Sequence, residues 1–154
     1  MDIADLIKRD RVIARLRATS KKQALQELAH RAAEITGQPE KAIFNVLMKR
    51  ERLGTTGVGN GVAVPHGKLA SLDRLYGLFA RLAHPIDFES IDDRPVDLIF
   101  VLLAPESSGA DHLKALARVS RLLRDRTACE KLRATEDEDA LYTLLTDTTA
   151  SWAA

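Results

Sequence analysis

The chain has 154 residues, of which 45% are hydrophobic and 29% charged, a composition typical of one globular domain with its own core. The formal net charge of +1 gives no general attraction to nucleic acid or to a membrane surface, and a single cysteine, Cys129, excludes an internal disulfide and a Cys-based zinc site. No apolar run reaches the ~20 residues that span a bilayer, and the first residues lack the pattern of a signal peptide. We therefore expect a cytoplasmic protein without membrane insertion.

Hydrophobic periodicity predicts helices and strands in alternation. In chain order, the predicted elements are a helical turn at 3–8, a strand at 12–18, helices opening at Ser20 and Pro39, strands at 58–64, 75–82 and 96–103 with turns at 84–86 and 92–95, helices at 111–125 and 127–133, a last helix capped by Thr135, and a frayed tail from Thr148. The strand at 12–18 places apolar residues on one face and arginines on the other, whereas 96–103 is almost continuously apolar, as in a central strand covered on both faces.

The helix boundaries follow from local signals. Ser20 with Gln23 three residues on predicts a capping box, and Gly37 predicts the end of that helix. Because helices alternate with strands without a regular repeat, we expect one α/β domain over residues 1–154. Its core would be a mixed sheet, parallel and antiparallel, of about five strands sandwiched between helices.

Residues 55–68 carry the clearest chemical signature. Three glycines allow close approach of the backbone, and 62–64 is a short, strand-like run. Pro65 cannot donate a ladder hydrogen bond, so it is expected to end the strand and leave His66 at its terminus, beside Gly67. An imidazole held there with small neighbours is a candidate functional group.

The glycine-rich stretch fits neither common nucleotide-binding pattern. It has one residue too many for a Walker A loop, and Leu69 stands where a Ser or Thr should hold magnesium. A dinucleotide fingerprint starting at Gly57 would need glycine in place of Val62. The sequence therefore predicts no nucleotide cofactor.

The other histidines differ in their setting. His30 is expected on the surface of the first helix, and His84 in a turn before a proline. His112 opens the helix after the 96–103 strand, and crevices beyond the carboxyl ends of strands are where open sheets bind ligands. A helix N-terminus there favours an anion such as phosphate.

Arg50 in the last turn of the second helix is a possible third member of a site with His66 and His112. The alternative is that Arg50 only complements the helix C-terminus and that the two histidines are unrelated surface residues. Periodicity alone does not decide whether the three meet.

Residues 55–69, with Pro65-His66-Gly67-Lys68 near their end, closely resemble the phosphorylation-site signature of the mannitol/fructose-type IIA proteins of the bacterial phosphoenolpyruvate phosphotransferase system. Within this family the chain is most similar to the nitrogen-regulatory branch, and Asn60, where mannitol relatives place an acidic residue, favours that branch. The resemblance continues over 85–88, 91–98, 102–105, 112–113, 127–129 and 137–142.

The resemblance implies that His66 accepts a phosphoryl group on Nε2 from a phosphorylated HPr-like carrier protein. It further implies that His112 and Arg50 are the second histidine and the arginine of the active site, which stabilise the phosphoryl oxygens. Neither role needs a metal or another cofactor. The chain would be a phosphotransferase component that regulates partners such as potassium transporters and sensor kinases, rather than a free-standing enzyme.

Three alternatives remain open. A sugar-specific IIA component would pass its phosphate to a separate IIB transporter domain in fructose or mannitol uptake. A metal-dependent hydrolase would use His66 and His112 as ligands, although the chain has no HExxH motif or comparable cluster. An interaction domain would carry no modified residue.

Overall fold

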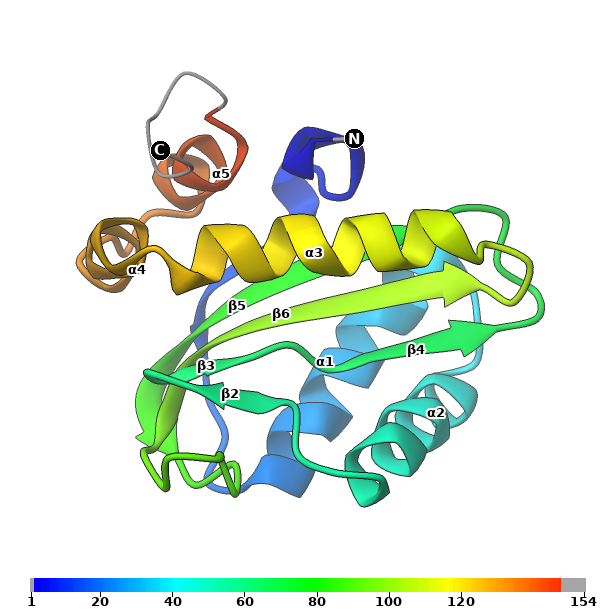
Figure 1. Ribbon diagram of the computed structural model, residues 1–154, viewed down its shortest axis with the longest axis horizontal. Helices are drawn as coiled ribbons and strands as arrows, with labels where there is room; N and C mark the ends of the chain where they lie inside the picture. The colour runs from blue at the N-terminus through cyan, green and yellow to red at the C-terminus, as the bar shows by residue number, and fades with distance from the viewer. Residues whose placement is uncertain (1, 148–154) are drawn as a thin grey trace.

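The computed structural model describes residues 2–147, so the expected frayed tail from Thr148 lies outside the described residues. A six-stranded sheet has helices on both faces (Figure 1). The strands are β1 (Val12–Leu16), β2 (Gly57–Gly59), β3 (Val62–Ala63), β4 (His66–Leu69), β5 (Tyr76–Ile86) and β6 (Val96–Pro105). The helices are α1 (Lys21–Thr36), α2 (Glu40–Arg52), α3 (Ala110–Arg124), α4 (Arg126–Arg133) and α5 (Glu138–Thr146), with short 3-10 turns η1 (Ile3–Asp5) and η2 (Arg9–Arg11).

The sheet is mixed, as predicted. Its order is β1-β5-β6-β3-β2, and β4 also pairs with β6. β6 runs antiparallel to β5 and parallel to both β3 and β4, while β1 is parallel to β5. The nearly continuous apolar run therefore forms the central strand that the sequence predicted.

Two cores lie on opposite faces of the sheet, and successive residues of β6 point into them in turn. Toward α1 and α2 point Ile99, Val101 and Leu103, and toward α3, α4 and α5 point Leu98, Phe100 and Leu102. All six are buried. A central strand covered on both faces must be apolar at every position, which explains the loss of alternation in its sequence.

The prediction that β1 buries one face only is wrong. Val12 packs into the core beside α3, whereas Leu16 packs into the core beside α1 and α2, together with Ile13. The register against β5 shifts between Ile13 and Leu16. An irregularity of this kind turns the following side chain to the other face, so a strict period of two does not hold.

The predicted strand at 58–64 is also wrong, because the segment folds as a hairpin. β2 and β3 pair antiparallel, and Asn60 and Gly61 form the turn with φ of 57° and 78°. Positive φ at both central residues is the geometry that Asn-Gly favours in a two-residue hairpin. The Gly61 carbonyl accepts hydrogen bonds from Asp97 N at 3.0 Å and Leu98 N at 3.1 Å, which ties the turn to the start of β6.

The bounds of other helices and strands differ from the predicted bounds by a few residues. β5 continues through His84 and Pro85, where a turn was predicted, and its register with β6 is irregular between Arg81 and Ile86. α5 is capped by Asp137, whose carboxylate accepts from Ala140 N at 2.9 Å, and not by Thr135. Within the described range, no helix has the length and apolar character needed to cross a membrane.

The cap of α1 is confirmed. The Ser20 hydroxyl accepts from Gln23 N at 3.1 Å, and Gly37 ends the helix with φ of 75°. The Gln23 side chain reaches back to Thr19 N at 2.6 Å, one residue before the position that a standard capping box uses.

Candidate functional site

His66 is the first residue of β4, whereas the sequence predicts that it lies just beyond the end of a strand at 58–64. β3 pairs with β6 at Leu98 and Ile99, and β4 pairs with the same strand from Leu102 onward. Val64 and Pro65 lie between these two segments, and the Pro65 carbonyl still accepts from Leu102 N of β6 at 3.0 Å. The Val64 carbonyl instead accepts from the side chain two residues on, His66 Nδ1, at 2.9 Å.

Two hydrogen bonds define the tautomer of His66. A carbonyl oxygen can only accept a hydrogen bond. His66 Nδ1 therefore carries a proton and donates to Val64 O. On the other side of the ring, Arg50 Nε lies 3.3 Å from His66 Nε2 and can only donate. Nε2 therefore presents a lone pair, and it is the nucleophilic nitrogen of the ring.

Arg50 serves two purposes from the last turn of α2. Its Nη1 donates to the Gly54 carbonyl at 2.8 Å, which stabilises the chain just beyond the helix. Its Nε faces His66 at the same time. Arg50 therefore stabilises the end of α2 and lies beside His66 at the same time.

Gly67 lets α2 approach β4 closely. A Cβ atom at this position would lie 2.2 Å from Val46 Cγ1, far inside van der Waals contact. The sequence suggested that Gly67 leaves the imidazole uncovered. The structure shows a different reason for glycine, which is to bring the helix that carries Arg50 next to the strand that carries His66.

His112 reaches the same place from α3. Its ring centroid lies 5.7 Å from that of His66, and the two rings are inclined by 58°. The side chain is buried, with 7% of the residue exposed, and its Nε2 has no hydrogen-bond partner. A buried ring nitrogen without a partner is costly, so it fits a site that gains a partner in another state of the protein.

The three residues that the sequence singled out therefore meet in one place. The other two histidines do not join them. His30 is exposed on α1 and pairs with Glu40, with Nδ1 2.7 Å from Oε1, and His84 is exposed on β5.

The surroundings favour neutral rings at this site. Burial lowers the pKa of His66; the hydrogen bond to Val64 raises it in part, and the nearby charge of Arg50 lowers it again. Burial also lowers the pKa of His112, and His66 and Lys68 lower it further. Both shifts widen the pH range over which the rings are neutral, and a neutral imidazole is the nucleophilic form.

One part of the site was missed by sequence reasoning. Glu51 is 7% exposed, and its carboxylate accepts from both the backbone N–H of Thr56, at 3.0 Å, and the Thr56 hydroxyl. Lys21 Nζ lies 2.9 Å from the same carboxylate. A signal was present, because Glu51 continues the buried i, i+4 row of Ile43 and Leu47 on α2, where a carboxylate is unexpected.

The arrangement does not resemble a metal centre. Within residues 2–147, no three His, Cys, Asp or Glu side chains are grouped so as to hold a metal ion. The group that faces His66 Nε2 is a guanidinium, and its positive charge suits an anion. The geometry therefore favours a phosphate-like group over a cation at this nitrogen.

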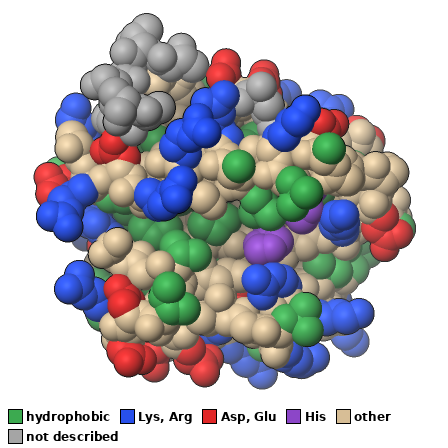
Figure 2. All heavy atoms as spheres, viewed as in Figure 1, with side chains coloured by type: hydrophobic (Ala, Val, Ile, Leu, Met, Phe, Trp, Pro, Cys, Tyr) green, Lys and Arg blue, Asp and Glu red, His purple; other side chains and the backbone are tan. Residues whose placement is uncertain are grey.

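The site opens onto one face of the molecule. Figure 2 shows histidine side chains at the centre of that face, with hydrophobic side chains and Lys or Arg side chains around them. Leu113, next to His112, is 68% exposed, and Leu53, close after Arg50, is 82% exposed. Large exposed apolar side chains beside a functional group are typical of a surface that contacts another protein.

Comparisons with known proteins find relatives that match nearly the whole chain. The model of the family described as phosphoenolpyruvate-dependent sugar phosphotransferase system, EIIA 2, matches residues 5–148. A nitrogen regulatory protein of Bradyrhizobium diazoefficiens is 61% identical over 145 residues, which cover 94% of this chain and 95% of the relative. The nitrogen regulatory protein of Escherichia coli is 39% identical over 149 residues, covering 96% of this chain and 91% of the relative.

The fold also matches that of a solved structure. The crystal structure of the nitrogen regulatory protein IIA-Ntr from Neisseria meningitidis superposes with a TM-score of 0.89 at 30% identity, over 94% of this chain and 99% of that one. The expected mixed α/β fold and the resemblance to the nitrogen-regulatory branch are both confirmed. The chain belongs to the EIIA 2 family of the phosphoenolpyruvate-dependent phosphotransferase system, in its nitrogen-regulatory IIA branch.

Proposed function

We propose that the chain is a cytoplasmic phosphohistidine carrier. His66 Nε2 accepts a phosphoryl group from a phosphorylated HPr-like protein, and the phosphorylation state decides which regulated proteins bind. Candidate partners are potassium transporters and sensor kinases. The observation that carries the proposal is the convergence of Arg50 and His112 on His66, whose Nδ1 is already engaged by Val64.

The transfer step is simple in terms of bonds and protons. Nε2 attacks phosphorus with its lone pair, the bond from phosphorus to the donor protein breaks, and the bonding electrons leave with the donor. The proton on Nδ1 stays where it is, held by the Val64 carbonyl. As positive charge develops on the ring, this hydrogen bond becomes charge-assisted and stronger. No base is needed at the attacking nitrogen.

Arg50 and His112 are suited to stabilise the oxygens in flight. Phosphoryl transfer asks a protein mainly for positioning and for charge stabilisation. The Arg50 guanidinium lies at the nitrogen that receives the phosphorus, so its donors can move from Nε2 to a phosphoryl oxygen. His112 Nε2 lacks a partner and can donate to another oxygen when it carries the proton.

The regulatory half of the proposal rests on charge and on exposed apolar surface. A phosphoryl group adds about −1.5 to −2 charges at neutral pH. Leu53 and Leu113 provide exposed apolar surface close to the residues that surround that group. A partner that buries this surface must also accommodate the new charge, so one modification can prevent one contact and create another.

The test is labelling with radioactive phosphoenolpyruvate and the two general proteins of the phosphotransferase system. We expect wild type to acquire an acid-labile, base-stable label, His66→Ala to acquire none, and His30→Ala, a control at an exposed histidine, to label like wild type. Thermal unfolding of each variant verifies its fold. Equal labelling of His66→Ala and wild type would overturn the proposal.

The regulatory half has a separate test. Pull-downs with wild type, His66→Ala and His66→Asp should retain different sets of proteins, because the aspartate adds a negative charge at the acceptor position. The same set of partners on phosphorylated and unphosphorylated wild type would contradict regulation while leaving the carrier role intact.

A further inference from the structure

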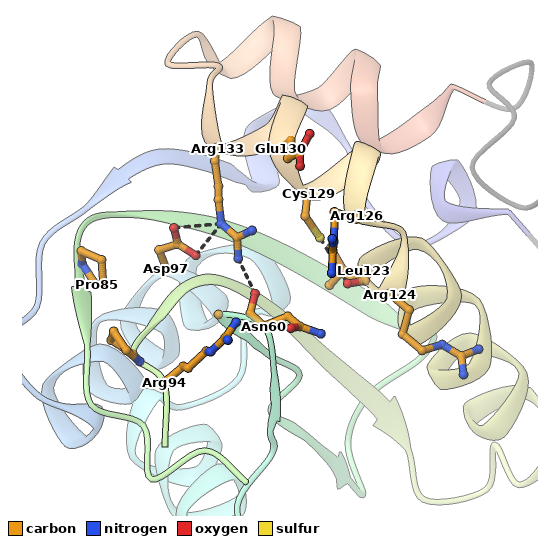
Figure 3. Close-up of a pocket in the computed structure, with 12 residues that line it drawn as sticks. Asn60, Pro85, Arg94, Asp97, Leu123, Arg124, Arg126, Cys129, Glu130 and Arg133 are labelled. Atoms are coloured by element: carbon orange, nitrogen blue, oxygen red, sulfur yellow. Dashed lines mark hydrogen bonds and ion pairs between the residues drawn. The ribbon is translucent and has the colours of Figure 1, made fainter. Parts of the chain in front are cut away.

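A hollow lies on the molecule between the β2–β3 turn, the start of β6 and α4 (Figure 3). Its volume is about 700 Å³, within the range of small-molecule sites. His66, His112 and Arg50 do not line it. The hollow is therefore separate from the site at His66.

Four arginines line this hollow: Arg94, Arg124, Arg126 and Arg133. Within residues 2–147, the guanidinium groups of the first three form no hydrogen bond and no ion pair. Arg94 has the carboxylate of Asp92 in its neighbourhood, but that carboxylate accepts instead from the backbone N–H groups of Asn60 and Arg94. The hollow is thus lined by three guanidinium groups that form no hydrogen bond or ion pair with other residues of the 2–147 range.

Arg133 is held in a fixed position at the same place. Its Nε lies 3.0 Å from both carboxylate oxygens of Asp97, and its Nη2 donates to the Asn60 carbonyl at 2.5 Å. Figure 3 shows Arg133 on one side of Asn60 and Arg94 on the other. Because Asp97 is neutralised by Arg133, it does not cancel the charge of the remaining arginines.

Charge and polarity together indicate the class of ligand. Asp97 and Glu130 are the acidic residues of the lining, and Figure 3 shows the Glu130 carboxylate pointing away from the Arg133–Asp97 pair. The lining also contains Leu123 and Cys129, which belong to the apolar core beneath. The planar guanidinium groups of arginine can donate paired hydrogen bonds to phosphate oxygens. The apolar residues of the lining suit an organic group attached to the phosphate.

We propose that this hollow is a second anion site, which binds a small organic phosphate. The phosphate lies between Arg94, Arg126 and Arg133, and the organic part packs over Leu123. The ligand would also touch the Asn60-Gly61 turn, whose backbone makes hydrogen bonds to Arg133 and to the start of β6. This site does not depend on the proposed role of His66.

The test is an NMR titration at constant ionic strength with phenyl phosphate and with inorganic phosphate. We expect saturable shifts of the Asn60 and Gly61 amides and of the arginine Nε–H signals, with a dissociation constant for phenyl phosphate of about 1 mM or tighter. Inorganic phosphate should bind at least about ten-fold more weakly, since it lacks the apolar part. Adenosine monophosphate is a third probe, for a larger organic body.

The paired variants are Arg94→Gln with Arg126→Gln, and Arg52→Gln with Arg121→Gln as the control. All four arginines are exposed, so both double variants should fold, and both remove two positive charges. We expect at least a ten-fold loss of phenyl phosphate affinity in the first pair alone. An equal loss in both pairs, equal binding of the two phosphates, or shifts that never saturate would overturn the proposal.

Discussion

At the scale of single residues, the chemistry of this site depends on which nitrogen of His66 is free. Val64 O accepts a hydrogen bond from Nδ1–H, and Arg50 Nε donates toward Nε2, so both hydrogen bonds select the same tautomer. The approach of a cation to a lone pair also keeps the ring neutral, in the same direction as burial. The hydrogen bonds thus orient the imidazole, and the lowered pKa favours its neutral form, with the lone pair on Nε2.

Arg50 gives the first prediction at this scale. Arg50→Gln removes a fixed charge from the phosphoryl oxygens, and we expect the rate of transfer to His66 to fall about 10²- to 10³-fold. Arg50→Lys keeps a charge but loses the planar fork, so a smaller loss of about ten-fold is expected. Rapid-quench labelling measures both, with Arg52→Gln as the exposed neighbouring control. A wild-type rate in Arg50→Gln would contradict the assigned role.

At the scale of elements, the site is a junction between a helix and a strand. α2 packs on β4 because Gly67 has no side chain, and this contact sets the separation of Arg50 and His66. α3 supplies His112 from the opposite face of the sheet, beyond the end of β6. Three separate elements, α2, β4 and the more distant α3, therefore deliver one side chain each.

This junction predicts the effect of Gly67→Ala. The new methyl group overlaps Val46 Cγ1, so the Val46 side chain or α2 itself must shift, and we expect a loss of stability of about 1–3 kcal/mol with slower labelling of His66. Val46→Ala removes the overlapping atom. The double variant Gly67→Ala with Val46→Ala should therefore label as fast as Val46→Ala alone. A double-mutant cycle measures this coupling between the two positions. Strictly additive losses would show that this contact does not set the site.

At the scale of the whole molecule, a buried charge cluster ties separate parts of the chain together. Lys21 at the start of α1 pairs with Glu51 near the end of α2, and Glu51 holds Thr56 at the entry to the β2–β3 hairpin. Lys21 Nζ also lies 4.9 Å from the ring centroid of Phe88 and 3.6 Å from a carboxylate oxygen of Glu89. The cluster thus joins two helices, the hairpin and the loop after β5.

The cluster predicts a large cost for Glu51→Gln. Lys21 would keep its charge with only 14% of its side chain exposed, and breaking such a pair by removing one partner should cost about 2–4 kcal/mol in the free energy of unfolding. Urea denaturation measures this. Glu106→Gln, at an exposed carboxylate, should change the free energy by less than about 0.5 kcal/mol. Similar small values for both variants would refute a structural role for the cluster.

The sequence by itself determined the features that depend on residues close together in the chain. The Ser20 cap, the Gly37 terminus and the central β6 strand were predicted because their signals lie within a few residues. The long similarity around His66 also pointed to the family, and the comparisons confirmed it. The hairpin at Asn60-Gly61 is locally encoded too, although the sequence analysis predicts a single strand at 58–64.

Only the tertiary structure decided how distant parts combine. Periodicity places Arg50, His66 and His112 at the ends of three elements, but the pairing of β4 with β6 and the close contact at Gly67 bring them together. The buried Glu51 and the unpartnered His112 nitrogen were equally invisible to a periodic pattern. The physical reason is that burial and hydrogen-bond partners depend on which elements become neighbours in the fold, and no local stretch of sequence contains that information.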